Sequence, residues 1–251
     1  MYIYCLEVSD VHNGFLRRRF GWLFCMIGMI MILGALSYQD LDKKHTVSGE
    51  TERTRILIID PGHGGDDGGA VSSDGVEEAD VNLSIAKRLE AISRLCGVNT
   101  IMTRRESTIQ YPAEAQTIAA RKVADQKQRV ALINDTPNAV LISIHQNLYP
   151  SSQPHGAQVL YAATNDSEQF GKQLHDNLIA LLDPQNRRVA APISEDIYLM
   201  KNIRCPGVLV ECGFLSNPEE CARLQTDAYQ IQLSLTMLSA YLVYFQNGVS
   251  L

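Results

Sequence analysis

The stretch RILIIDPGHGGDDGGA, residues 55–70, passes from an apolar run directly into a loop that contains five glycines. The apolar run predicts a short buried β-strand that ends near Asp60. Glycine permits sharp turns and close approach of the backbone to a ligand, so the loop could hold a phosphate or a metal, or simply turn the chain. The loop lacks the Gly-Lys-Ser/Thr ending of a P-loop, which weakens the case for nucleotide binding.

Strands and helices alternate through the chain that follows this stretch. The predicted strands are residues 55–60, 97–104, 139–145, 156–162 and 207–213. The predicted helices are residues 81–96, about 113–134, 167–182, 218–224 and 227–246. This alternation predicts a layered α/β domain with a mostly parallel central sheet.

The N-terminal part of the chain has a different character. Residues 17–19 are three arginines, and the uncharged segment 21–38 after them is about long enough to span a bilayer as a helix. The positive charge on its N-terminal side predicts that residues 1–20 lie in the cytoplasm and the bulk of the chain outside it. Small residues at Ala35 and Ser37 leave a cleaved signal peptide as the alternative.

The chain as a whole has an ordinary globular composition and a net charge of −6, and the part after the N-terminal segment has no long basic stretch, which argues against nucleic acid as a partner. The polar residues 39–54 indicate a linker. None of the six cysteines forms a C-x-x-C pair, which argues against a zinc ribbon. We expect scattered unpaired cysteines, with a disulfide among Cys205, Cys212 and Cys221 as the alternative.

Polar residues stand at the carboxyl ends of three predicted strands. Asp60 and His63 follow the first, His145 ends the central one, and Glu211 lies near the end of the last. A fourth candidate group precedes the first helix and consists of the acidic residues Glu77, Glu78 and Asp80. Ligands of open α/β sheets bind outside the carboxyl ends of the strands, so these groups could face one crevice.

Two histidines and one carboxylate, with a position left for water, form a ligand set of catalytic zinc. A second carboxylate could then take the proton from that water. Each side chain also has a structural alternative: a turn for His63, a core hydrogen bond for His145, a helix-terminal acid for Glu78 and a buried ion pair for Glu211. Glu211 is the hardest to explain structurally, because a carboxylate inside an apolar strand must be paired or ligated.

Four motifs in this order resemble the zinc-dependent N-acetylmuramoyl-L-alanine amidases of the AmiC-type, or amidase 3, family: IIDPGHGGDDGGA, EEADVNL, SIHQN and VLVECGFLSNPEE. The resemblance covers about residues 55–246. Two longer stretches, together with the short apolar N-terminal segment, resemble the germination-specific spore cortex amidases: ARKVADQKQRVALIN and IYLMKNIRCPGVLVECGFLSNP.

The resemblance implies a central mixed, mostly parallel six-stranded sheet flanked by helices. It implies hydrolysis of the amide between N-acetylmuramic acid and L-alanine in peptidoglycan. It also implies one Zn²⁺ per chain, bound by His63, Glu78 and His145, with Glu211 as the catalytic carboxylate. The catalytic domain is then residues 55–251.

Further residues of the motifs are assigned in the same way. Glu78 is preferred to Glu77, because the family's ligand stands two places before the aspartate of DVNL. Asn82 and Asn147 are interpreted as side chains that orient a ligand or the substrate. Gln146 replaces a small residue of many relatives, so we expect it to narrow the cleft without touching the ligand set.

The narrower resemblance implies action on spore cortex, where removal of stem peptides precedes formation of muramic δ-lactam. We expect the domain to act outside the cytoplasm, anchored by its N-terminal helix or exported, with the space between the spore membranes as one such location. An accessory protein could be needed. Two other functions remain open: a zinc peptidase that cuts within the stem peptide, and a non-catalytic anchored protein that only binds peptidoglycan.

Overall fold

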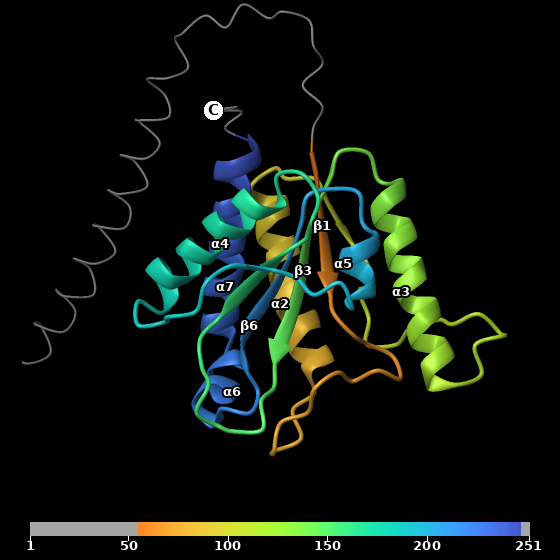
Figure 1. The fold of residues 1–251 in the computed structure, drawn as a ribbon, viewed down its shortest axis with the longest axis horizontal. Coiled ribbons are helices and arrows are strands. Elements are labelled where there is room, and N and C mark those ends of the chain that lie inside the picture. The colour runs from red at the N-terminus through yellow and green to blue at the C-terminus, as the bar shows by residue number, and fades with distance from the viewer. Residues whose placement is uncertain (1–54, 247–251) are drawn as a thin grey trace, which may run out of the picture. The chain divides into compact units, whose positions relative to one another are not determined.

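The computed structural model describes residues 55–246, so the expectations for residues 1–54 lie outside the described part. A six-stranded sheet runs in the order β2-β1-β3-β6-β4-β5 (Figure 1). Its strands are β1 (Ile56–Pro61), β2 (Thr100–Met102), β3 (Ala139–Asn147), β4 (Gln158–Tyr161), β5 (Ala191–Pro192) and β6 (Gly207–Phe214). Neighbouring strands are parallel except β4 and β6, which confirms the mixed, mostly parallel sheet.

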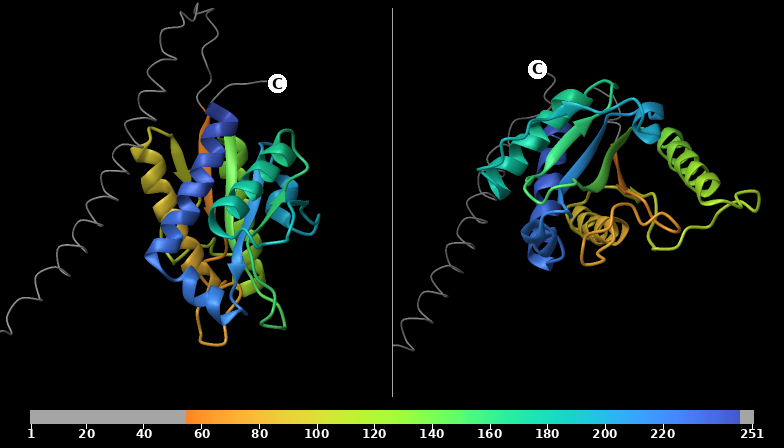
Figure 2. Two further views of the ribbon diagram at one scale, coloured as in Figure 1. Left: turned by 90° about the vertical axis from the view of Figure 1, so that its left-hand side faces the viewer. Right: turned by 60° about the horizontal axis from the view of Figure 1, so that its bottom comes forward.

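Helices cover both faces of this sheet (Figure 2). They are α2 (Glu78–Leu95), α3 (Ile118–Asp135), α4 (Ser167–Leu182), α5 (Tyr198–Asn202), α6 (Pro218–Leu224) and α7 (Asp227–Tyr241), and a π-helical turn, Leu242–Gln246, continues α7. α2, α4 and α7 pack on one face, while α3 and α5 lie on the other. No helix among residues 55–246 is both long and apolar enough to cross a membrane.

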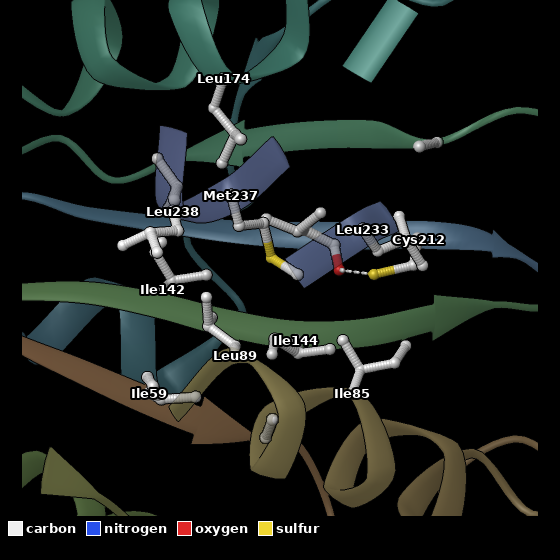
Figure 3. Close-up of a cluster of buried hydrophobic side chains, with 14 of the residues drawn as sticks. Ile59, Ile85, Leu89, Ile142, Ile144, Leu174, Cys212, Leu233, Met237 and Leu238 are labelled. Atoms are coloured by element: carbon white, nitrogen blue, oxygen red, sulfur yellow. Dashed lines mark hydrogen bonds between the residues drawn. The ribbon is translucent and has the colours of Figure 1, made fainter. Parts of the chain in front are cut away.

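The larger part of the core lies between the sheet and α2, α4 and α7. Figure 3 shows Ile142 and Ile144 of β3 pointing into it beside Leu89 and Met237. Side chains alternate along a strand, so the residues between them face α3 and α5 instead. On that face Leu141 lies in a smaller apolar cluster, and the polar side chains that follow it reach the carboxyl edge of the sheet.

Several boundaries differ from the sequence predictions. The helix predicted from about residue 113 begins at Ile118, because the hydroxyl of Thr117 accepts a hydrogen bond from the amide of Ala120 and caps it there. β5 and α5 were not predicted from the residues, because two and five residues are too few to show periodicity. Cys96, Cys205, Cys212 and Cys221 are free thiols, so the alternative of a disulfide among the last three is wrong.

Candidate metal centre

The three polar strand ends meet at one edge of the sheet. β1, β3 and β6 are adjacent and parallel, and His145 is the register partner of Glu211. Pro61 pairs with Ile144, so His63 emerges from β1 just beyond the same edge. Glu78, the first residue of α2, reaches this edge from the helix.

His63, Glu78 and His145 form a compact group whose potential ligand atoms all lie within 4.8 Å of one another. Nε2 of His63 lies 3.2 Å from Oε2 of Glu78, and Nδ1 of His145 lies 2.9 Å from Oε1. Two imidazoles and one carboxylate are a donor set of catalytic zinc. The group can therefore hold a metal ion, and Glu78 is its central member.

The protonation states of His63, Glu78 and His145 depend on one another. Burial opposes ionisation of Glu78, but hydrogen bonds and attraction from His145 and His63 outweigh it and hold the pKa of this carboxyl well below its usual range. Burial alone would lower the pKa of His63, yet Glu78 and Asp67 raise that pKa to about 8. A metal ion and protons compete for these imidazoles, so metal binding would release protons.

The glycines of the loop make room for this group. His63 itself has a left-handed backbone with φ 59°, a conformation that costs energy and recurs at functional sites. A Cβ on Gly62 would lie 2.2 Å from Cε1 of His145, and one on Gly69 would lie 2.6 Å from Oε2 of Glu78. The close approach of the loop to the ligand set therefore requires glycine at these two positions.

Two buried arginines hold the same loop by its carbonyl groups, and neither was predicted from the sequence. Arg104 donates to the carbonyl oxygens of Pro61, at 3.0 Å, and Gly62, at 2.9 Å. Arg129 of α3 donates to Pro61 at 2.8 Å and to His63 at 2.6 Å. Both stand in polar stretches of ordinary appearance, and only the folded chain reveals their role.

Asp60 completes the support of the loop. It is buried and accepts hydrogen bonds of 2.6 Å from Thr103 and from Ser143, and one of 2.8 Å from Arg129. Burial would raise the pKa of Asp60, but Arg129 and these hydroxyl groups outweigh it and keep the pKa below its usual range. Asp60 is thus an anchor behind the group rather than a member of it.

Glu78 is also fixed from its own helix and from β3. Asn82 Nδ2 lies 3.3 Å from Oε1 of Glu78 and 3.2 Å from the carbonyl oxygen of Gly62. The main-chain N–H of Gln146 donates to the same Oε1 at 3.1 Å, and its side chain donates to Asn82 at 3.1 Å. The side chain of Gln146 lines the cavity beside His63 and contacts Asn82 rather than a proposed ligand, and only its main-chain N–H reaches Glu78.

The other amide of the prediction lies apart. Asn147 ends β3 beyond a register irregularity, and its carbonyl oxygen accepts from the amide of Leu215 at 2.8 Å. It is not among the residues that line the cavity beside His63. The structure brings Asn82 to the group and does not bring Asn147.

Glu211 is half-buried, and its Oε2 has no hydrogen-bond partner among residues 55–246. Burial raises the pKa of Glu211, and the nearby Glu78 adds to the rise, while His145 opposes it. An unpaired buried carboxylate is costly, which points to a ligand, water or substrate as its partner. The structural alternative of a buried ion pair does not occur, since no cation contacts Glu211 within the described residues.

A cavity of about 270 Å³ opens beside these groups. It is lined by Asp60, Gly62, His63, Asp67, Glu78, Lys122, Asp125, Gln126, Arg129, His145, Gln146, Ile197, Leu199, Leu209 and Glu211.

Asp67 was not singled out from the sequence, although it stands four places after His63. Its Oδ2 lies 3.0 Å from Nδ1 of His63, and its Oδ1 lies 2.8 Å from Nζ of Lys122. A carboxylate in this position orients a ligating imidazole.

Comparison with known proteins gives consistent matches. The family described as N-acetylmuramoyl-L-alanine amidase matches residues 57–240. The germination-specific N-acetylmuramoyl-L-alanine amidase of Bacillus subtilis is 35% identical over 92% of this chain and 97% of its own length. The amidase AmiC of Escherichia coli is 26% identical over 80% of this chain and 55% of its own length.

A solved structure agrees with these sequence matches. The CwlD amidase of Clostridioides difficile, determined in complex with the GerS lipoprotein, superposes with a TM-score of 0.73 at 32% identity. The match covers 77% of this chain and 99% of that one. The region of likeness contains the strands and helices that carry His63, Glu78, His145 and Glu211.

Proposed function

Because the chain belongs to the N-acetylmuramoyl-L-alanine amidase family and is itself a peptidoglycan amidase, we propose that it uses zinc to remove stem peptides from spore cortex, ahead of muramic δ-lactam formation. The observation that carries the catalytic part is the convergence of His63, Glu78 and His145 beside the unpartnered carboxylate of Glu211. The likeness to a germination-specific amidase over nearly the whole of both chains supports the cortex as substrate.

His63, Glu78 and His145 would hold the zinc ion. When bound, zinc supplies a Lewis acid that polarises the amide carbonyl and makes water more acidic. Asp67 orients the ring of His63, and Asn82 and the amide of Gln146 fix the carboxylate of Glu78. Arg104 and Arg129 keep the loop of His63 in place through its carbonyl groups.

Glu211 acts in proton transfer. Its carboxylate accepts a proton from the attacking water and then delivers it to the nitrogen of L-alanine as the carbon–nitrogen bond breaks. The products are a lactyl carboxylate on the glycan and a stem peptide with a free L-alanine amine. Burial raises the pKa of Glu211, so the group holds this proton between the two steps more readily than an exposed carboxyl would.

Digestion of purified cortex by the full chain tests this function. Mass spectrometry should find intact stem peptides with new L-alanine amines, and a zinc chelator should stop their release. A zinc peptidase would instead leave shortened stems on the glycan. A protein that only binds peptidoglycan would create no new termini, and either result would refute the proposal.

We further propose that the domain acts outside the cytoplasm, with residues 21–38 as anchor or export signal, and that an accessory protein takes part. The arginines at 17–19 support the orientation. A relative solved with the GerS lipoprotein supports the partner. Protease added outside sealed membranes should digest the chain beyond residue 40. Full protection would disprove this orientation.

A further inference from the structure

The cavity beside the metal centre has two chemically different walls. Ile197, Leu199 and Leu209 form an apolar wall on the side of α5 and β6. Lys122 and Gln126 of α3 contribute polar groups to the lining. A ligand that fits this space needs small apolar groups on one side and a polar or anionic group on the other.

The cavity lining contains Lys122 and Arg129, and of these two Lys122 can still bind a ligand. Arg129 also lines the cavity, but it is buried and its guanidinium is occupied by Asp60, Asp125 and loop carbonyl groups. The side chain of Lys122 is 48% exposed, and its ammonium contacts Asp67 at 2.8 Å. An ammonium has three N–H donors, so Lys122 can bind Asp67 and still donate to a second acceptor.

Lys122 lies near the proposed ligand His63, and the stem peptide carries an acidic group a short distance from the bond that is cut. The carboxylate of Asp67 contacts the His63 ring through one oxygen and the Lys122 ammonium through the other, so only this carboxylate separates the two groups. In a stem peptide, L-alanine is followed by D-glutamate joined through its γ-carboxyl, which leaves the α-carboxyl free or amidated. That group is about two residue lengths, roughly 7 Å, from the scissile amide in an extended chain.

We propose that Lys122 binds the α-carboxylate of the second stem residue and makes the enzyme selective for stems in which this carboxyl is not amidated. The inference rests on the proposed amidase function and names the part of the substrate that the cavity recognises. The methyl groups of the lactyl and L-alanine units then face Ile197, Leu199 and Leu209. The carboxylate of Glu211, which is not a proposed zinc ligand, would repel an anionic stem, and Lys122 in the same lining offsets that repulsion.

The test compares two synthetic muramoyl peptides that differ only in this group, one with D-glutamate and one with D-isoglutamine. The full chain should hydrolyse the acid with about 10- to 100-fold higher kcat/KM, as expected for a hydrogen bond between charged groups. Lys122→Met, which keeps the length and removes the charge, should lose this preference, mainly through a higher KM for the acid. Lys127→Met is the matched control, because Lys127 is exposed on the same helix and does not line the cavity.

Calorimetry with the corresponding dipeptides provides a second readout. The full chain should bind L-alanyl-γ-D-glutamate more tightly than its amide, and Lys122→Met should bind both alike. Equal use of the two substrates by the full chain would overturn the inference. Equal losses on both substrates in Lys122→Met, accompanied by loss of zinc, would also overturn it and assign Lys122 to the support of Asp67. If neither substrate is hydrolysed, the proposed function fails, and the calorimetric comparison still decides the role of Lys122.

Discussion

His145 and Glu211 are register partners on two adjacent parallel strands in the middle of the sheet. Strands in a sheet lie about 4.7–4.9 Å apart, and the backbone hydrogen bonds fix that spacing. The proposed metal ligand and the proposed proton carrier are therefore placed by the sheet itself. His63 and Glu78, in contrast, depend on a loop and on a helix end, which explains why so many side chains brace those two residues.

Replacing Glu78 by glutamine should remove most of the bound zinc, whereas the same change at Glu77 should leave zinc content near that of the parent chain. Glu78 is 3% exposed and contacts both histidines, while Glu77 precedes the helix and is exposed. Metal analysis of the two purified variants gives the comparison. Full zinc occupancy in Glu78→Gln would remove Glu78 from the ligand set.

Glu211→Gln should fold, keep its zinc and hydrolyse peptidoglycan about 10²–10⁴-fold more slowly. The amide keeps the size of the side chain but cannot take a proton from water. Rate measurements must accompany metal analysis of the same preparation. A rate near that of the parent chain would disprove the role of Glu211 in proton transfer, and loss of zinc would make it a ligand instead.

Gly69→Ala should weaken metal binding much more than Gly75→Ala. Both glycines have positive φ, +71° and +84°, so both changes carry the backbone cost of about 1–2 kcal/mol. A methyl group on Gly69 would also lie 2.6 Å from Oε2 of Glu78, whereas nothing lies within 4 Å of the corresponding position on Gly75. Urea unfolding of both variants measures the backbone strain that they share, and zinc titration measures the additional clash with Glu78 in Gly69→Ala. Equal zinc affinities would show that the loop can move aside.

Asp60→Asn should destabilise the fold by about 3 kcal/mol at neutral pH. This is the lower end of the range for removing one partner of a buried ion pair, because Arg129 still has Asp125 as a second ion-pair partner. The pKa of Asp60 is lowered from 3.8, so its contribution is present above that value and is lost as the pH falls through the folded-state pKa. The difference in unfolding free energy between parent and variant should therefore shrink below about pH 4. Urea unfolding across this range checks it, and a difference that stays constant with pH would contradict the assignment.

The sequence predicted the strands that carry the centre, because long apolar runs such as the one that ends at His145 are unambiguous. It also indicated that the polar strand ends would meet, since parallel strands share one carboxyl edge. Arg104, Arg129 and Lys122 could not be found in this way. Their roles depend on loop and helix placements that leave no periodic pattern, and an arginine that binds carbonyl groups looks in sequence like any solvated charge.

The strand order has a consequence for the time at which activity can arise. β1, β3 and β6 are neighbours in the sheet but are separated in the chain by whole helices. A nascent chain cannot assemble the three proposed ligands until His145 has been synthesised, and Glu211 follows later still. A chain that has not yet reached β6 lacks the proposed proton carrier, so a lytic enzyme made on this plan stays inactive until that strand has been synthesised.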